Sequence, residues 1–358
     1  MFVPGLAMLP FAPSVGSGLD VFKVVAVALL GFLFSISSVG FSVMFLRKAA
    51  GNLVNVPIAN KATTSAAPPA KPYRDETLNM LLQASLLTGA VSIAATRLGN
   101  EYAKPLNTLF MLCSTVASYV WGACALPVAF TKIVHPLVIG TFLTLVVTQL
   151  SGLATGITFL SALRTYKVGS LDIMKVGAGD ILLHMLGPAV ISFAMSMYSR
   201  KKLLRENLFV VLLAILVSSV GGLFGTAAFV RAIQLGGANG ALVRLSVLPR
   251  NITTALAMAV ASILGGDISI AASTVILSGI TAATYGRAVM TAMGIHDPVS
   301  RGLAIGASGQ GLGVASIVSE PDAFPFAAMS MVLTAVAATT LVSIPQIKDA
   351  IVSLATGV

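Results

Sequence analysis

Apolar residues in this chain fall into long runs, and polar residues are confined to the short segments between the runs. One helical crossing of a bilayer needs roughly 20 apolar residues. A shorter run, residues 152–163, cannot span a bilayer and predicts an interfacial or re-entrant piece. The longer runs predict about ten transmembrane segments: residues 21–46, 78–96, 106–130, 133–150, 177–198, 207–234, 249–264, 268–293, 299–319 and 324–345. We therefore expect an all-α polytopic membrane protein.

The composition supports this fold class. Of the 358 residues, 56% are hydrophobic and only 9% are charged, whereas about 25% of the residues of a soluble domain are charged. The formal net charge of +10 comes mostly from basic residues at the ends of apolar runs, as in loops on the non-translocated side of a membrane. We expect the lipid bilayer as a partner and no nucleic acid, because no basic stripe is interleaved with aromatic residues. Association into a homo-oligomer is left open.

One polar stretch rich in alanine, proline and threonine, residues 60–77, has the composition of a disordered linker. It predicts three parts: residues 1–50 with one transmembrane helix, a linker at 51–77, and a hydrophobic membrane domain at 78–358. This membrane domain contains a weak internal echo, because residues 135–153 and 248–266 both have proline at their second position and glycine near their end. We expect a two-fold repeat with interrupted helices, which is typical of secondary transporters. Small-residue packing between helices is the alternative.

The stretch VGAGDILLH, residues 176–184, has the Gly-x-Gly-Asp pattern of intramembrane aspartyl proteases. Such an enzyme needs two carboxylates that share a proton, and the chain offers no suitable second aspartate. Asp180 and His184 are one helical turn apart, where they can pair and serve as a proton or substrate site. The alternative is that Asp180 only caps the helix.

Other catalytic and metal-binding patterns are also missing. Cys113 and Cys124 share one apolar run, and the three histidines are spread along the chain. These spacings fit neither a disulfide framework nor a metal site. We expect no catalytic residues, no metal and no cofactor.

The stretch VLPRNITTAL, residues 247–256, places polar groups where a helix is predicted to start, with Pro249 in its first turn. Free N–H groups at a helix start attract anions, and arginine can clamp a carboxylate through two hydrogen bonds. We expect Arg250, Asn251, Thr253 and Thr254 to bind a small hydroxy-acid anion. The alternative is that Arg250 extends to the lipid headgroups.

A glycine-rich stretch, residues 306–316, adds further candidate ligands. Irregular backbone at membrane depth survives where it lines a cavity or is buried in protein. We expect Ser308, Gln310, Gly311 and Gly313 to contribute to substrate binding, with close helix packing as the alternative. Arg301, near the start of the same predicted segment, is expected to be a membrane-side anchor.

Four stretches together resemble the LrgB/CidB membrane family, and within it the plastid branch: DILLHMLGPAVISFAMSMYSRKKLLREN, LSVLPRNITTALAMAVASILGG, IHDPVSRGLAIGASGQGLG and SEPDAFPFAAMSMVLTA. The resemblance covers about residues 130–355. Residues 1–50 are similar only to the tail of the LrgA-like region that precedes the LrgB-like region in plastid members. We therefore expect that the chain is truncated at its N-terminus.

The resemblance implies a secondary transporter that exchanges the small organic anions glycolate and glycerate across the chloroplast inner envelope in photorespiration. The alternative function is a holin- or antiholin-like pore, or a regulator of murein hydrolase export, as bacterial relatives have been described. The sequence departs from the family at Gln310, because members usually carry a histidine there. A glutamine can hydrogen-bond a substrate but cannot take up a proton, so the histidine's proton role is not carried over.

Overall fold

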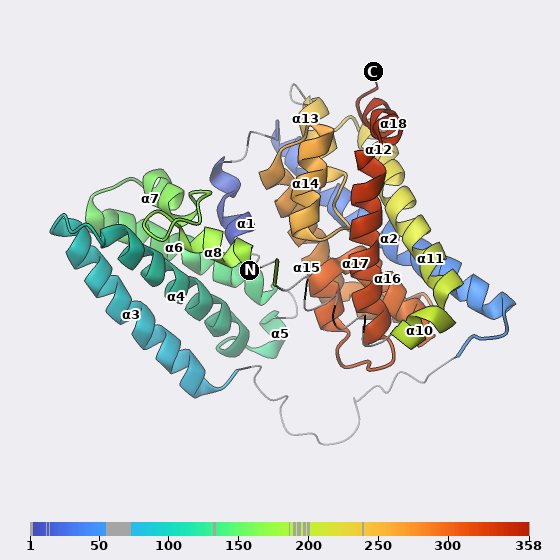
Figure 1. Cartoon of the computed structure of the whole chain (residues 1–358), viewed down its shortest axis with the longest axis horizontal. Coiled ribbons are helices and arrows are strands. Elements are labelled where there is room, and N and C mark those ends of the chain that lie inside the picture. Colours follow the sequence, from blue (N-terminus) through green and yellow to red (C-terminus); the bar gives the residue numbers. More distant parts are fainter. Residues whose placement is uncertain are drawn as a thin grey trace. The chain divides into compact units, whose positions relative to one another are not determined.

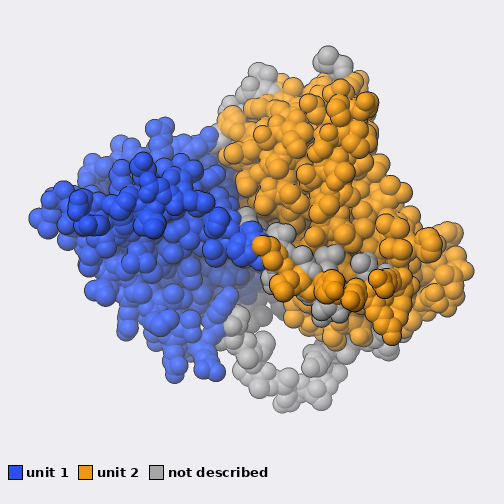
Figure 2. Space-filling model, in the orientation of Figure 1, with its two compact units in different colours: residues 1–11, 60–188 blue, residues 12–59, 189–358 orange. Residues whose placement is uncertain are grey.

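The computed structural model describes residues 3–11, 13, 15–54, 73–131, 134–185, 187, 188, 191, 195, 198, 201–237 and 240–357. All regular elements in these residues are helices, which confirms the predicted all-α class. The chain forms two compact units, residues 1–11 with 60–188 and residues 12–59 with 189–358 (Figure 2).

Six of the described helices are long and apolar enough to cross a membrane: α2 (Gly18–Ala49), α3 (Asp75–Arg97), α6 (Pro136–Thr155), the continuous helix Leu208–Ala232, α15 (Ile268–Ala292) and α17 (Phe324–Ser343). Each of the six lies on a predicted crossing. The predicted crossing at 177–198 falls partly outside the described residues. The total of about ten crossings and the internal repeat stay predictions.

The first unit is built around three neighbouring helices, with α4 packed against both α3 and α6 (Figure 1). Short helices complete the unit, and its small core includes Met111, Leu163 and Tyr166. Its other elements are α1 (Val3–Ala7), η1 (Leu9–Phe11), α4 (Ala103–Cys124), α5 (Val128–Thr131), α7 (Phe159–Tyr166) and α8 (Ala178–His184). The run at 152–163, predicted to be too short to span, forms the end of α6 and the beginning of α7.

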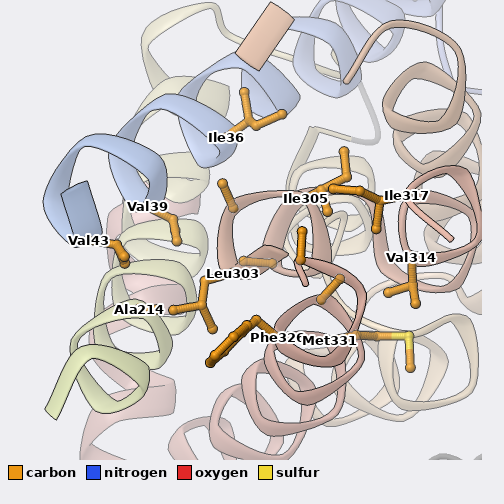
Figure 3. Packing of buried hydrophobic residues seen from close by; sticks show 14 of the residues in the cluster. Ile36, Val39, Val43, Ala214, Leu303, Ile305, Val314, Ile317, Phe326 and Met331 are labelled. Atoms are coloured by element: carbon orange, nitrogen blue, oxygen red, sulfur yellow. The ribbon is translucent and has the colours of Figure 1, made fainter. Parts of the chain in front are cut away.

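The second unit is centred on α16, which packs against α2, α15, α17 and α11 (Figure 1). Besides α2, α15 and α17, its elements are α10 (Lys201–Glu206), α11 (Leu208–Leu216), the π-helical turn η2 (Val217–Gly221), α12 (Gly222–Ala232), α13 (Gly240–Val247), α14 (Thr254–Leu264), α16 (Pro298–Ser316) and α18 (Pro345–Thr356). Buried side chains such as Ile36 and Val39 of α2, Ala214 of α11 and Leu303 and Ile305 of α16 form one hydrophobic cluster (Figure 3).

Three irregular segments of this second unit interrupt or separate helices. The long helix Leu208–Ala232 contains the π-helical turn Val217–Gly221, and π turns of this kind are frequent at functional sites. Helices α13 and α14 are separated by the irregular residues 248–253. Helix α16 is kinked at Gln310, whose φ of 49° and ψ of −142° are not helical. Broken helices within a membrane protein expose backbone groups that a buried ligand or side chain must satisfy.

The helix predicted to start at Pro249 starts five residues later, because Thr253 is the N-cap of α14. The backbone N–H of Asp267 donates a hydrogen bond to Ser246 Oγ at 2.7 Å, so the end of α14 lies against the end of α13. Residues 248–253 must therefore span the length of α14, roughly 16 Å for an 11-residue helix. This demand is incompatible with a helix over 249–253 and leaves Arg250 and Asn251 on an irregular turn.

The predicted division into residues 1–50, 51–77 and 78–358 stays a prediction. Of the linker at 51–77, residues 55–72 lie outside the described residues. Helix α2, from the first predicted part, belongs to the same compact unit as residues 189–358.

Candidate anion-binding site

Arg250 lies on the irregular turn before α14 and is 1% exposed. Its Nε donates to Thr226 Oγ1 at 3.0 Å, and its Nη2 donates to Ser35 Oγ at 3.2 Å. Its Nη1 is buried and has no hydrogen-bond partner among the described residues. No carboxylate is paired with Arg250 in the described part of the chain. The guanidinium is thus a buried cation held by two neutral hydroxyls, and its third nitrogen has no hydrogen-bond partner among the described residues.

The side-chain amides of Asn251 and Gln310 connect the three irregular segments next to Arg250. Asn251 Nδ2 donates to Ser218 O in the π-helical turn at 3.1 Å and to Ala307 O in α16 at 3.4 Å. Gln310, at the kink of α16, donates through Nε2 to Arg250 O at 2.8 Å. Side-chain amides therefore satisfy carbonyl groups on all three interrupted segments and hold them together around Arg250.

Further buried polar atoms lack partners beside this turn. Thr253 Oγ1 and Thr254 Oγ1 are buried with no hydrogen-bond partner among the described residues, and Thr253 makes no side-chain cap to α14. On α15, Ser278 Oγ is also buried and unpaired, one turn after Val275, whose carbonyl accepts a 3.5 Å bond from Gln310 Nε2. Buried polar groups are normally satisfied. Unpaired donors at positions 250, 253 and 254 suit an oxygen-rich anion that would satisfy them.

We call Arg250, Asn251, Thr253, Thr254 and Gln310 the Arg250 cluster. All five belong to the second unit and come from the predicted site. Three further predicted residues lie on α16 on either side of Gln310. Ser308 is fully buried and its hydroxyl donates to Ala304 O of the same helix at 2.7 Å. Gly311 and Gly313 follow the kink, and a Cβ at Gly313 would come within 2.9 Å of Ile305 O, so that glycine allows the two halves of α16 to approach each other across the kink. A substrate role for these three stays a prediction.

Sequence reasoning missed two residues that hold the guanidinium, Ser35 and Thr226. Both are hydroxyl residues within long apolar runs, where serine and threonine commonly bond to their own helix. Neither has a sequence signal of its own. The close approach of Gly31 to Arg250 was also hidden: a Cβ at Gly31 would collide with Arg250 Nε.

Asp180 and His184 lie in the first unit, on α8. The Asp180 carboxylate accepts hydrogen bonds from the backbone N–H groups of Val168, Gly169 and Gly177 at 2.8, 2.9 and 3.0 Å. The bond from Gly177 caps the start of α8, which is the alternative that the sequence left open, and the other two tie the loop after α7 to this helix. The His184 side chain is exposed. A proton or substrate role for the two residues is not tested by these contacts.

Arg301 is not the membrane-side anchor that the sequence suggests. It is 1% exposed, and its Nε and Nη2 donate to the two carboxylate oxygens of Glu320 at 2.7 and 2.8 Å. Its Nη1 donates to Ile295 O at 2.9 Å. Glu320 follows Arg301 by 19 residues, on the loop after α16, so the pairing depends on how that loop folds back.

A family model described as the LrgB-like family matches residues 115–346. The chain belongs to the LrgB-like family. The match includes the π-helical turn, the Arg250 cluster and all of α16, and it confirms the resemblance seen in the sequence. Helix α2, which supplies Ser35 and Gly31, lies outside the matched residues.

This LrgB-like protein is also similar to a plant transporter. The plastidal glycolate/glycerate translocator 1, chloroplastic, of Arabidopsis thaliana is 30% identical over 362 residues, an alignment that covers 99% of this chain. The chain spans 66% of the length of that relative. No solved structure matches the chain.

Proposed function

We propose that this LrgB-like protein is a secondary transporter of small 2-hydroxy monocarboxylates, and that the Arg250 cluster binds the carboxylate. The observation that carries the proposal is a fully buried guanidinium whose partners among the described residues are neutral hydroxyls and whose Nη1 has no partner there. Burying an unpaired charge costs several kcal/mol. A bound anion would offset this cost, which explains why a membrane protein would keep such a group.

Within this proposal, each residue of the cluster has a distinct part. Arg250 supplies the positive charge and an N–H donor to a carboxylate oxygen. Thr253 and Thr254 supply hydroxyls that can donate to the carboxylate or bond the 2-hydroxyl group of the substrate. Asn251 and Gln310 hold the turn in place, since their amide groups bond to backbone carbonyls.

The substrates we propose are glycolate and glycerate, exchanged across the chloroplast inner envelope in photorespiration. The support is the similarity to the plastidal translocator named above. Both molecules carry one carboxylate and a hydroxyl on the adjacent carbon, which matches a site with one guanidinium and neighbouring hydroxyl donors. No chemical step is proposed, and the protein acts as a carrier and not as an enzyme.

The test is counterflow in proteoliposomes. Purified protein is reconstituted in vesicles loaded with unlabelled glycerate, and uptake of labelled glycolate is measured with and without an imposed pH gradient. We expect saturable uptake that requires glycerate inside. The Arg250→Gln variant should lose at least 99% of this uptake, because a buried charge contact contributes about 3 kcal/mol or more. An Arg231→Gln variant, which removes an exposed arginine of the same unit, is the matched control and should transport normally.

A pore would give a different result. Uptake that is not saturable, admits uncharged solutes of similar size and is equal in the wild type and Arg250→Gln would contradict a carrier with an anion site. It would favour the holin-like alternative.

The same vesicles test the predicted proton site. If Asp180 and His184 transfer protons, Asp180→Asn and His184→Gln should both remove the dependence of uptake on the pH gradient. If Asp180 only caps α8, Asp180→Asn should lower stability and His184→Gln should change neither property. We propose that Asp180 and His184 transfer protons in a proton-linked transport cycle.

A further inference from the structure

Helix α2 lies outside the residues that match the LrgB-like family, yet it packs inside the second unit. Eleven of its residues are buried, and it packs most extensively against α16 and α15 (Figure 1). Ile36, Val39 and Val43 belong to the hydrophobic cluster around α16 (Figure 3). The helix is therefore an integral part of the unit that contains the Arg250 cluster.

One face of α2 is small and polar where it meets Arg250. Gly31 and Ser35 are four residues apart and thus share a helix face. Both are buried, Ser35 at 2% exposure. The Ser35 hydroxyl accepts the hydrogen bond from Arg250 Nη2, and a Cβ at Gly31 would collide with the guanidinium. A larger residue at position 31 is excluded unless Arg250 moves.

The two hydrogen bonds of Arg250 have a geometric consequence. A guanidinium is planar and rigid, so fixing two of its nitrogens fixes the direction of the third. Thr226 of α12 holds Nε, and Ser35 of α2 holds Nη2. Without Ser35 the guanidinium would keep only its hydrogen bond to Thr226 and could rotate about that bond. Its Nη1 would then no longer be held in a fixed direction.

We propose that α2 is a working part of the anion site: Ser35 orients the Arg250 guanidinium toward the substrate, and Gly31 provides the room that it occupies. Ser35 is a positioning residue, which acts through Arg250 and need not touch the anion. The inference rests on the proposed function. It extends the site beyond the part of the chain that the LrgB-like family covers.

The experiment compares two matched pairs of variants in the glycolate–glycerate exchange assay, with KM and maximal rate measured for each. Ser35→Ala is paired with Ser37→Ala, whose hydroxyl bonds to Leu33 O of its own helix at 2.6 Å. Gly31→Ala is paired with Gly40→Ala, where a Cβ would meet Ile295 Cδ1 at 2.6 Å, away from Arg250. Each control removes or adds the same atoms of α2 as the variant it is paired with, at a position that does not contact the guanidinium.

We expect Ser35→Ala to raise the KM for glycolate about tenfold with a nearly unchanged maximal rate, because a hydrogen bond to a charged group is lost. Gly31→Ala should reduce exchange at least as much as Ser35→Ala. Ser37→Ala and Gly40→Ala should keep the wild-type KM. Thermal unfolding of each variant in detergent confirms folding, and if Gly31→Ala does not fold, the serine pair decides alone.

Two negative results are distinguishable. If the wild type exchanges glycolate, Arg250→Gln abolishes the exchange and Ser35→Ala retains the wild-type KM, the role of α2 is overturned and the proposed function stands. If the wild type exchanges no organic anion, the proposed function fails and the role of α2 falls with it.

Discussion

Two arginines of the second unit are equally buried, and their surroundings differ. Arg250 and Arg301 are each 1% exposed. Arg301 donates to both oxygens of Glu320, and its remaining nitrogen bonds to Ile295 O. Arg250 has only the hydroxyls of Ser35 and Thr226, and its Nη1 has no partner in the described part of the chain. All three nitrogens of the Arg301 guanidinium are bonded, whereas the Arg250 guanidinium has one nitrogen without a partner among the described residues.

The difference shows that burial alone does not identify a binding arginine. A buried ion pair with all its donors satisfied fixes a loop, and removing one partner strands the other. A buried cation that has no carboxylate contributes an unsatisfied charge to the fold, which an incoming anion can satisfy. The same substitution by methionine should therefore lower stability at Arg301 and leave it unchanged or higher at Arg250.

The largest expected effect is on stability at the ion pair. Arg301→Met leaves the Glu320 carboxylate without its bidentate partner, so we expect the free energy of unfolding to fall by about 3 kcal/mol. The measurement is an unfolding titration of purified protein in mixed micelles. Exchange per folded molecule should remain normal. A stability equal to that of the wild type would show that the pair is not structural.

The next effect is on transport at the incomplete arginine. Under the proposed function, Arg250→Met should reduce glycolate uptake by at least about 100-fold, since the charge proposed to bind the anion is gone. Its free energy of unfolding should stay equal or rise by about 1 kcal/mol, because an apolar residue of similar volume replaces an uncompensated charge. A fall in stability as large as that of Arg301→Met would remove the contrast between the two sites.

A smaller effect is expected at the unpaired hydroxyls. Thr253→Val and Thr254→Val keep the side-chain shape, and the stability of these variants should not decrease, because neither hydroxyl has a hydrogen-bond partner among the described residues. Each should raise the KM for glycolate about tenfold if the hydroxyl binds the substrate. Thr274→Val is the control, since its hydroxyl bonds to Ile270 O of its own helix at 2.9 Å. If Thr253→Val and Thr254→Val keep the wild-type KM, as the control should, the two threonines do not bind the substrate.

The smallest effect is a pH dependence at Glu320, on the loop after α16. Burial acts to raise the pKa of Glu320, but the hydrogen bonds and charge of Arg301, with a smaller part from Arg287, lower it below its ordinary value. A depressed pKa means that the unfolded state binds the proton more tightly, so stability is present above the unfolded pKa. This stability is lost as the pH falls through the folded pKa.

The melting temperature of the wild type should therefore decline below about pH 5 more steeply than that of Glu320→Gln. The Glu320→Gln variant should be less stable than the wild type at pH 7, but its melting temperature should change less on acidification. Parallel curves for the two proteins would show that protonation of Glu320 does not contribute to acid unfolding.

Much of the candidate site could be predicted from the sequence. Arg250, Asn251, Thr253 and Thr254 stood out because ionisable and polar side chains are costly in an apolar run and need a reason to be there. Gln310 stood out because it lies among glycines that permit a broken helix. The start of α14 was misplaced by five residues, because Pro249 suits a helix start locally while the packing of α14 against α13 requires an irregular turn.

The sequence by itself predicted the six long apolar helices found among the described residues, since transfer of an apolar run into lipid depends on the length and composition of that run. It also marked the residues whose presence in such runs is costly. Only the tertiary structure decided that Glu320 reaches Arg301 while Ser35 and Thr226 reach Arg250. These contacts join residues from 19 to 215 positions apart, and hydropathy, caps and motifs carry no information on which distant side chains will meet.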